Sequence, residues 1–230
     1  MRRTLLLLLL GSAGTATAQN TAPKLSSREV AAGWRLLFDG QTTHGWRGFK
    51  RDSVPSGWSV VDATLTKSAA TGDIMTRDQF ANFELELDWQ ISKGGNSGIF
   101  FRGTEEENRI YWTAPEYQLL DDENTFDGRN RLTSAGSAYG LYAPPEGILK
   151  PPGEWNTTRI LVKDSHVEHW LNGKKLLEYE LGSEDWEAKV KASKFAVWPK
   201  YGRAKRGHIA IQGDHEGRLS IRKVKIREIL

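Results

Sequence analysis

The chain contains no cysteine among its 230 residues. This absence excludes disulfide bonds, thiolate metal ligands, a cysteine nucleophile and a lipid-modified cysteine at a processed N-terminus. The leucine run at residues 5–10 is too short to span a bilayer. Because Arg2 and Arg3 precede this run and small residues follow it at 16–18, it is typical of a cleavable secretory signal peptide. We therefore expect a periplasmic or secreted protein that loses residues 1–18 and has no membrane anchor.

A strong excess of charge of either sign is also missing. The sequence has 32 Lys and Arg against 29 Asp and Glu, a formal net charge of +3. Removal of residues 1–18 would take away Arg2 and Arg3 and leave 30 against 29, or +1. Basic and acidic residues are interspersed, apart from a basic cluster between Lys200 and Arg206, so we expect no nucleic-acid partner.

Several common catalytic motifs are absent. The sequence has no G-x-S-x-G elbow, phosphate-binding glycine loop, dinucleotide fingerprint or H-E-x-x-H zinc motif. The remaining options are acid–base chemistry without an organic cofactor, and a divalent cation held by oxygen ligands near Asp121, Asp122 or Asp214.

Strand patterns dominate after residue 56. Segment 57–68 predicts two short strands around an Asp62-Ala63 turn, and segment 83–91 alternates between apolar and polar residues. Another strand is expected from Thr158 to Val162, and the Asn172-Gly173 dipeptide predicts a hairpin. Two more strands are expected within 207–213 and 219–229, with short helical turns after Ser27 and over 184–190. This succession predicts an all-β sandwich in one domain over residues 29–230, after a flexible segment at 19–28.

The richest polar stretch runs from Asn96 to Asp121. In an extended chain Asn96, Gly98 and Arg102 share one face, and Glu116 and Gln118 share a face of the next strand. Gly98 weakens strand packing but allows another group to approach closely. We interpret this face as a ligand site. The alternative is an ordinary half-solvated sheet face.

A row of carboxylates at Glu84, Glu86 and Asp88 lies on one face of another strand. Neighbouring members stand about 6 to 7 Å apart at the backbone, which allows a paired-acid glycosidase mechanism. A β-sandwich glucanase class carries E-x-D-x-x-E on such a strand, but here Ile91 takes the position of the last Glu. The row can equally be a solvated surface.

Aromatic and histidine residues supply further candidates. There are nine tryptophans; most should fill the core, but Trp112 and Trp198 are candidates for stacking on a sugar. On the segment 208–212, His208 and Gln212 share a face, and an imidazole that titrates near neutral pH is a natural proton shuttle.

The assembled motifs resemble the bacterial 3-keto-disaccharide hydrolase domain family. The matching segments run in order through the mature chain: WRLLFDGQTTHGW, FELELDWQISKGGNSGIFFR, PEYQLLDDE, SAYGLY, GEWNTTRILVKDSHVEHWLNGKKLLEYE and GRAKRGHIAIQGDHEG. The resemblance implies a concanavalin A-like jelly-roll β-sandwich of two antiparallel sheets. It also implies an enzyme that cleaves glycosides whose C3 hydroxyl has been oxidised to a ketone, with a sugar 3-oxidoreductase upstream.

Such a ketone acidifies the C2 proton, so a base can form an enediolate that expels the C1 substituent. The resemblance implies His208 or Glu116 as base or acid, and Arg102, Lys205 or a cation at the enediolate oxygen. The expected substrate ligands are Asn96, Gln118, Gln212, Asp88, Asp121 and Tyr139, with Trp112 and Trp198 for stacking.

One segment departs from the family pattern. The family often reads QDHG, whereas Gln212 here is followed by Gly213, Asp214 and His215. The inserted glycine is expected to move His215 away, which favours His208. Two other readings remain open: a noncatalytic carbohydrate-binding module and a conventional β-sandwich glycosidase.

Overall fold

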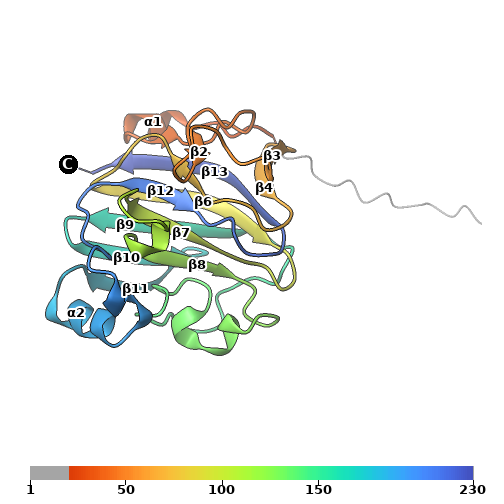
Figure 1. The fold of residues 1–230 in the computed structure, drawn as a ribbon. Helices are drawn as coiled ribbons and strands as arrows, with labels where there is room; N and C mark the ends of the chain where they lie inside the picture. Colours follow the sequence, from red (N-terminus) through yellow and green to blue (C-terminus); the bar gives the residue numbers. More distant parts are fainter. Residues whose placement is uncertain (1–20, 230) are drawn as a thin grey trace, which may run out of the picture.

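A computed structural model of the protein describes residues 21–229, so the predicted signal peptide lies outside the described residues. Two antiparallel sheets pack face to face (Figure 1). The larger sheet has the order β11 (Lys174–Glu180), β10 (His166–Leu171), β9 (Asn156–Lys163), β6 (Phe83–Ile91), β13 (Leu219–Glu228), β4 (Thr64–Lys67) and β3 (Trp58–Val61), and β1 (Arg35–Leu36) also pairs with β13. The five-stranded sheet has the order β2 (Trp46–Gly48), β5 (Ile74–Thr76), β12 (His208–Ile211), β7 (Asn96–Gly103) and β8 (Glu116–Leu120). The predicted jelly-roll β-sandwich is confirmed.

The predicted alternation sets the two faces of the long strands. In β6, Phe83, Leu85, Leu87 and Trp89 are buried in the core between the sheets. The five-stranded sheet sends Ile99, Phe101, Leu119, Ile209 and Ile211 into the same core. The opposite face of each strand is then free to carry polar groups.

Tight turns join neighbouring strands as the sequence predicts. The Asn172-Gly173 turn links β10 to β11, and both residues have positive φ, 50° and 81°. Asp62 and Ala63, at φ 47° and 55°, link β3 to β4. Turns with two left-handed residues match the twist of the paired strands.

Helices are short. In α1 (Ser27–Ala31) the N-cap is Ser26, one residue before the predicted cap, and Ser26 and Glu29 form a capping box. The first residues of this helix overlap the segment 19–28 that was predicted to be flexible. The second helix, α2 (Glu184–Lys191), is capped by Ser183 and agrees with the predicted range. In the part of the chain that the structure describes, there are also four 3-10 helices: η1 (Ile110–Trp112), η2 (Asp127–Arg129), η3 (Arg131–Thr133) and η4 (Lys194–Val197).

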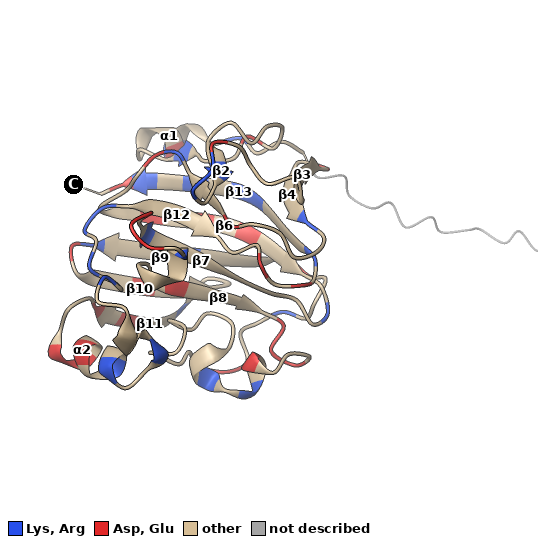
Figure 2. Ribbon diagram, viewed as in Figure 1, with Lys and Arg blue, Asp and Glu red and all other residues tan. Residues whose placement is uncertain are grey.

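Within residues 21–229, none of the helices has the length and hydropathy that a membrane-spanning segment requires. Figure 2 shows that Lys and Arg positions alternate with Asp and Glu positions along the ribbon, without one region of a single sign.

Candidate active site

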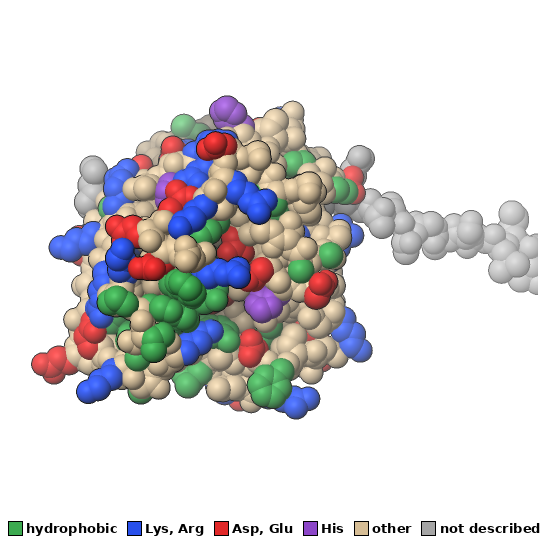
Figure 3. All heavy atoms as spheres, viewed as in Figure 1, with side chains coloured by type: hydrophobic (Ala, Val, Ile, Leu, Met, Phe, Trp, Pro, Cys, Tyr) green, Lys and Arg blue, Asp and Glu red, His purple; other side chains and the backbone are tan. Residues whose placement is uncertain are grey.

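A pocket opens on the outer face of the five-stranded sheet, in front of β7, β8 and β12. Its volume is about 310 Å³, within the range of small-molecule sites. We call it the β8 pocket, and its lining residues are Asn96, Tyr111, Glu116, Gln118, Asp127, Tyr139, Lys194, Trp198, Gln212, Asp214 and His215. Figure 3 shows acidic, basic, histidine and hydrophobic side chains gathered on this face.

Strand register brings together the polar groups at the base of the pocket. Gly98 of β7 pairs with Gln118 of β8, and Asn96 pairs with Leu120. The strand β12 lies on the other side of β7, where Gln212 N donates to Gly98 O at 2.9 Å. The structure thus places Asn96, Gln118 and Gln212 in one pocket, as expected for side chains that share a face.

Glu116 is the most deeply buried carboxyl group of the pocket, with 7% of its surface exposed. Its side chain lies directly over Gly98, where a β-carbon would come within 1.9 Å of Glu116 Oε1. Burial raises the pKa of Glu116 to about 8, and Asp73, Asp214 and Asp127 add to the increase. Nearby Lys194 opposes it. Glu116 is therefore mainly protonated at neutral pH and can donate a proton.

Two amides beside Glu116 are suited to bind hydroxyl groups. The side-chain amide of Gln118 is oriented with its nitrogen toward two acceptors. This nitrogen donates to Glu116 Oε1 at 3.3 Å and to Ser97 O at 3.1 Å. Gln212 is 7% exposed, and its Oε1 is buried without a hydrogen-bond partner. A buried acceptor without a partner costs stability, so Gln212 Oε1 is a ready acceptor for a ligand hydroxyl.

A cation and a phenol face each other at the rim. Lys194 Nζ lies 4.3 Å from the centroid of the Tyr139 ring, and Tyr139 Oη donates to Asp127 Oδ2 at 3.3 Å. Burial, followed by the charges of Asp127 and Glu116, raises the pKa of Tyr139. The phenol therefore keeps its proton, while Lys194 supplies positive charge next to Glu116.

Aromatic rings form one wall. Trp198 lines the pocket and stacks on Trp112 with ring centroids 5.6 Å apart and planes at 19°. Tyr111 packs edge-on against Trp198 at 5.5 Å. Trp112 supports the wall from behind without lining the pocket, which leaves Trp198 and Tyr111 to contact a sugar ring.

The loop at 213–217 brings Asp214 and His215 to the pocket. The expectation that Gly213 moves His215 away is not what the structure shows. A β-carbon on Gly213 would lie 2.3 Å from Gly72 O, so glycine lets the loop pack tightly against residues 71–73. Gly213 N donates to Asp73 Oδ1 at 2.8 Å and fixes this contact.

His208 does not line the β8 pocket, and the structure does not bring it together with Glu116. The ring is 5% exposed, with Nδ1 donating to Thr76 O at 2.7 Å and Nε2 accepting from Gln79 Nε2 at 3.0 Å. Burial lowers the pKa of His208 and favours the neutral ring. Both ring nitrogens are thus occupied by structural hydrogen bonds.

Arg102 and Lys205 line a different cavity, of about 550 Å³, beside Asn82 and Asp164. The predicted alternation fails at Arg102 because β7 has a bulge there: His208 pairs with Gly103 and Ala210 with Phe100, and Arg102 adopts φ 51°. Its guanidinium donates to Ala81 O, Asp164 O and Asn82 Oδ1.

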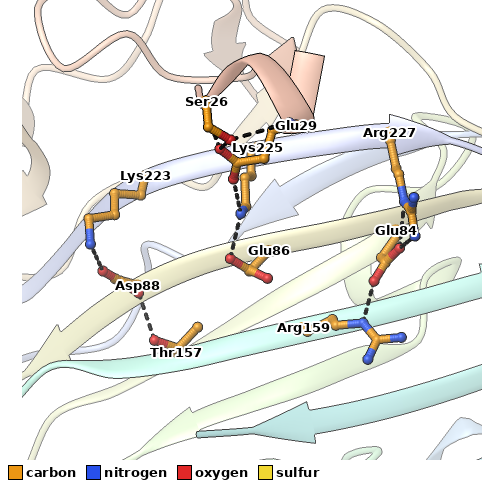
Figure 4. A network of polar contacts seen from close by, with 10 residues as sticks. All are labelled: Ser26, Glu29, Glu84, Glu86, Asp88, Thr157, Arg159, Lys223, Lys225 and Arg227. Atoms are coloured by element: carbon orange, nitrogen blue, oxygen red, sulfur yellow. Dashed lines mark hydrogen bonds and ion pairs between the residues drawn. The ribbon is translucent and has the colours of Figure 1, made fainter. Parts of the chain in front are cut away.

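Asp88 lies on the outer face of the other sheet with the rest of the carboxylate row (Figure 4). Lys223 and Arg222 pair with Asp88 at 3.1 and 3.3 Å, and Thr157 Oγ1 donates to it at 2.7 Å. Glu86 pairs with Lys225 at 2.8 Å, and Glu84 pairs with Arg227 and Arg159. Every member of the row has a cationic partner, as expected for a structural surface.

Asp121 supports the pocket from outside it. Its carboxylate accepts hydrogen bonds from Gly94 N at 2.7 Å and Glu123 N at 3.2 Å. The first bond orders the turn that leads into Asn96. The neighbouring Asp122 accepts from Ala135 N at 2.8 Å.

Among residues 21–229, one group of side chains has the spacing of a metal site. It consists of His166, Glu168 and Glu178, whose possible ligand atoms all lie within 4.8 Å of one another. This group lies on β10 and β11, in the sheet that does not bear the β8 pocket. Lys175 pairs with both carboxylates, at 3.6 and 2.6 Å, and so competes with a cation there.

Sequence reasoning missed Lys194, Asp127 and Tyr111 as pocket residues. All three lie in or beside 3-10 helices, which have no periodic sequence pattern long enough to place their side chains. A signal for the loop was present, because Asp214 and His215 lie only two and three residues after Gln212.

Comparison with known proteins identifies the family of the chain. The family model described as a 3-keto-alpha-glucoside-1,2-lyase-like domain matches residues 33–227. A 3-keto-disaccharide hydrolase of Bacteroides thetaiotaomicron is 34% identical over 229 residues, covering 86% of this chain and 79% of the relative.

Two crystal structures from Parabacteroides distasonis, both described as candidate glycosyl hydrolases, share the fold. The first has 35% identity and a TM-score of 0.86, covering 91% of this chain and 100% of the other. The second has 27% identity and a TM-score of 0.66, covering 85% and 99%. The chain therefore belongs to the 3-keto-alpha-glucoside-1,2-lyase-like domain family and is a carbohydrate-cleaving enzyme of the glycoside hydrolase or lyase type.

Proposed function

We propose that this enzyme cleaves the glycosidic bond of 3-keto-glycosides, including 3-keto-disaccharides, by removal of the C2 proton and elimination of the C1 substituent. The observation that carries the proposal is Glu116. It is a carboxyl group with its pKa raised to about 8, in the same pocket as Lys194 and the loop imidazole of His215. An acid that holds a proton, a cation and an imidazole that can accept a proton are the groups that this chemistry requires.

The roles follow from charge and position. His215 removes the C2 proton, and the electron pair moves into the C2–C3 bond and onto the C3 oxygen. Lys194 stabilises the resulting negative charge. The enolate then reforms the C3 ketone, a C1–C2 double bond forms, and the C1–O bond breaks. Glu116 gives its proton to the departing oxygen, so an alcohol and a cyclic enone are released.

Net hydrolysis needs one further step. Water adds its hydroxyl to C1 and a proton to C2 of the enone, which gives the free 3-keto sugar. Protonated His215 and ionised Glu116 are in the states needed for this addition, with His215 returning the proton to C2 and Glu116 accepting one from water. The pocket can therefore serve elimination and hydration in turn.

Several other groups position the sugar. Asn96, Gln118 and Gln212 bind its hydroxyls, and Trp198 and Tyr111 pack against its C–H face. We extend the proposal to an exported enzyme, because the first 18 residues resemble a signal peptide. An enzyme that oxidises C3 of the intact glycoside must supply the substrate.

The test compares a 3-keto-glucoside that bears a chromogenic leaving group with the same glucoside before oxidation, with and without a chelator. Release from the ketone alone supports the proposal. Release from both indicates a conventional glycosidase, and sugar binding without release indicates a binding module. Loss of activity on chelation, restored by added metal, would replace Lys194 with a cation as the oxyanion stabiliser.

A further inference from the structure

Lys67, the last residue of β4, is almost entirely buried, with 1% of its surface exposed. Lysine is almost never buried to this extent without partners. Its Nζ donates to two backbone oxygens, His215 O at 2.6 Å and Gly217 O at 3.0 Å. These two bonds span Glu216, so one side chain holds the middle and the end of the pocket loop.

The loop at 213–217 passes from β12 in one sheet to β13 in the other. Its beginning is fixed by Gly213, which donates to Asp73 Oδ1 and accepts from Thr71 N, both at 2.8 Å. Its end is packed closely, since a β-carbon on Gly217 would lie 2.7 Å from Gly95 Cα. Within residues 21–229, the bond from Lys67 is the hydrogen bond that joins His215 to a residue outside the loop, and Asp214 lies 3.9 Å from His215 Nε2 within it.

We propose that Lys67 is a positioning residue that fixes the 213–217 loop so that Asp214 and His215 face the β8 pocket. The expected effect on catalysis rests on the proposed function, whereas the expected order of the loop does not. A loop that is ordered before substrate binds loses no conformational freedom at the reaction step. Lys67 does not line the β8 pocket, so it holds the loop without occupying the space of the sugar.

Charge gives Lys67 a second effect on the same loop. Burial lowers the pKa of Lys67, and the nearby carboxylates of Glu216, Asp214 and Asp73 oppose this shift by favouring the charged form. A buried positive charge in turn reduces the repulsion that arises where the loop brings Asp214 close to Asp73. Loss of the ammonium therefore removes two hydrogen bonds and leaves that repulsion uncompensated.

The experiment uses Lys67→Met, which keeps the length of the stem, and Lys67→Arg, which keeps the donors. Thr66→Val is the matched control, because Thr66 is the next residue on β4, is 2% exposed and bonds to Ser220 Oγ rather than to the loop. Each variant is examined by hydrogen exchange of the 213–217 amides and by kcat and KM on the chromogenic 3-keto-glucoside.

In Lys67→Met we expect faster exchange confined to residues 213–217 and a fall in kcat of about tenfold to a hundredfold, with a smaller change in KM. Lys67→Arg should recover part of both, and Thr66→Val should change neither. Unaltered loop exchange in Lys67→Met, or a loss of kcat no larger than that of Thr66→Val, would overturn the proposal.

Two further outcomes are also decisive. If Lys67→Met does not fold, Lys67→Arg is used for the test. Loop exchange and kcat equal to those of the wild type would support positioning by the donors of residue 67. Slow turnover with native loop exchange would overturn the proposal. If the wild-type protein does not cleave the ketone, the proposed function fails, while the exchange data still decide whether Lys67 orders the loop.

Discussion

The carboxyl group of Glu116 occupies the space that a side chain on Gly98 would fill. A β-carbon at Gly98 would lie 1.9 Å from Glu116 Oε1 and 2.7 Å from its carboxyl carbon. Glycine in the middle of β7 is therefore required for the close packing that buries this acid. The same burial is the first cause of the raised pKa of Glu116.

Gly98→Ala tests this relationship. The methyl group should push the Glu116 carboxyl from its position toward solvent, lower its pKa toward 4.5 and reduce kcat/KM by about a hundredfold, the usual contribution of a proton-transfer group. Overpacking should cost about 1–3 kcal/mol of stability. Kinetics and thermal unfolding check both effects. Gly45→Ala is a control outside the β8 pocket, since a β-carbon at Gly45 would meet Leu37 O at an ordinary contact distance of 3.4 Å. Full activity in Gly98→Ala would contradict the role given to Glu116.

Glu116→Gln should change how stability depends on pH. In the folded protein the pKa of Glu116 is about 8, against 4.5 for the free group, so the folded state retains a proton that the unfolded state releases. The free energy of unfolding should therefore fall as pH rises from about 4.5 to about 8. The Gln variant lacks this loss, and its stability relative to wild type should increase from pH 5 to pH 9. Denaturant melts at three pH values measure the difference, and a constant difference would show that the pKa of Glu116 is not raised.

The same variant tests the acid role. Wild-type kcat/KM should fall above about pH 8 as Glu116 ionises, and Glu116→Gln should lose this limb together with about a hundredfold in rate. An alkaline limb that persists in the variant would belong to another group.

Strand bounds and strand faces were predictable where alternation is unbroken. The pattern of 83–91 gave the bounds of β6, and the faces of Asn96, Gln118 and Gln212 followed from period 2. The prediction failed at Arg102, because a bulge and a positive φ turn its side chain to the other side of the sheet. Bulges are set by long-range pairing between strands, and local alternation does not record them.

The other differences between expectation and structure arise from long-range packing. The carboxylate row with Asp88 lies on one sheet and the β8 pocket lies on the other. Both sheets have a polar outer face, and only the packing of the whole chain decides which of these faces carries the pocket. The effect of Gly213 depends on its contact with Gly72, more than a hundred residues earlier. Lys194 and Asp127 reach the pocket from 3-10 helices, which are too short to show a periodic sequence pattern.

Lys194→Met should remove the positive charge at the enolate oxygen. We expect kcat to fall by about a hundredfold to a thousandfold, in the range found when an oxyanion donor is lost, with little change in thermal stability because Lys194 is exposed. The loss of Lys194 should also raise the pKa of Glu116 further and shift the alkaline limb upward. Lys191→Met, an exposed change on α2, is the control. Activity within threefold of wild type would exclude Lys194 as the stabiliser.

Gln212→Met should separate stability from binding. Because Gln212 Oε1 is buried without a partner, its replacement by an apolar side chain should leave the unfolding temperature unchanged or raise it. The loss of one hydrogen bond to the sugar should raise KM by about tenfold. Thermal unfolding with and without a 3-keto sugar distinguishes the two effects, and a large fall in stability of the free protein would show that Gln212 serves the fold.

Arg102→Met should damage the fold and leave the chemistry intact. The three hydrogen bonds from Arg102 join the bulge of β7 to residues 81–82 and to the turn at Asp164, so their loss should cost about 1–3 kcal/mol for each buried acceptor left without a partner. The folded fraction should keep kcat/KM within about threefold of wild type, because the guanidinium does not line the β8 pocket. Lys205→Met, an exposed change in the same cavity, should alter neither quantity. If Arg102→Met instead kept its stability and lost a hundredfold in kcat, Arg102 would take part in the reaction, and the cavity of about 550 Å³ would replace the β8 pocket as the active site.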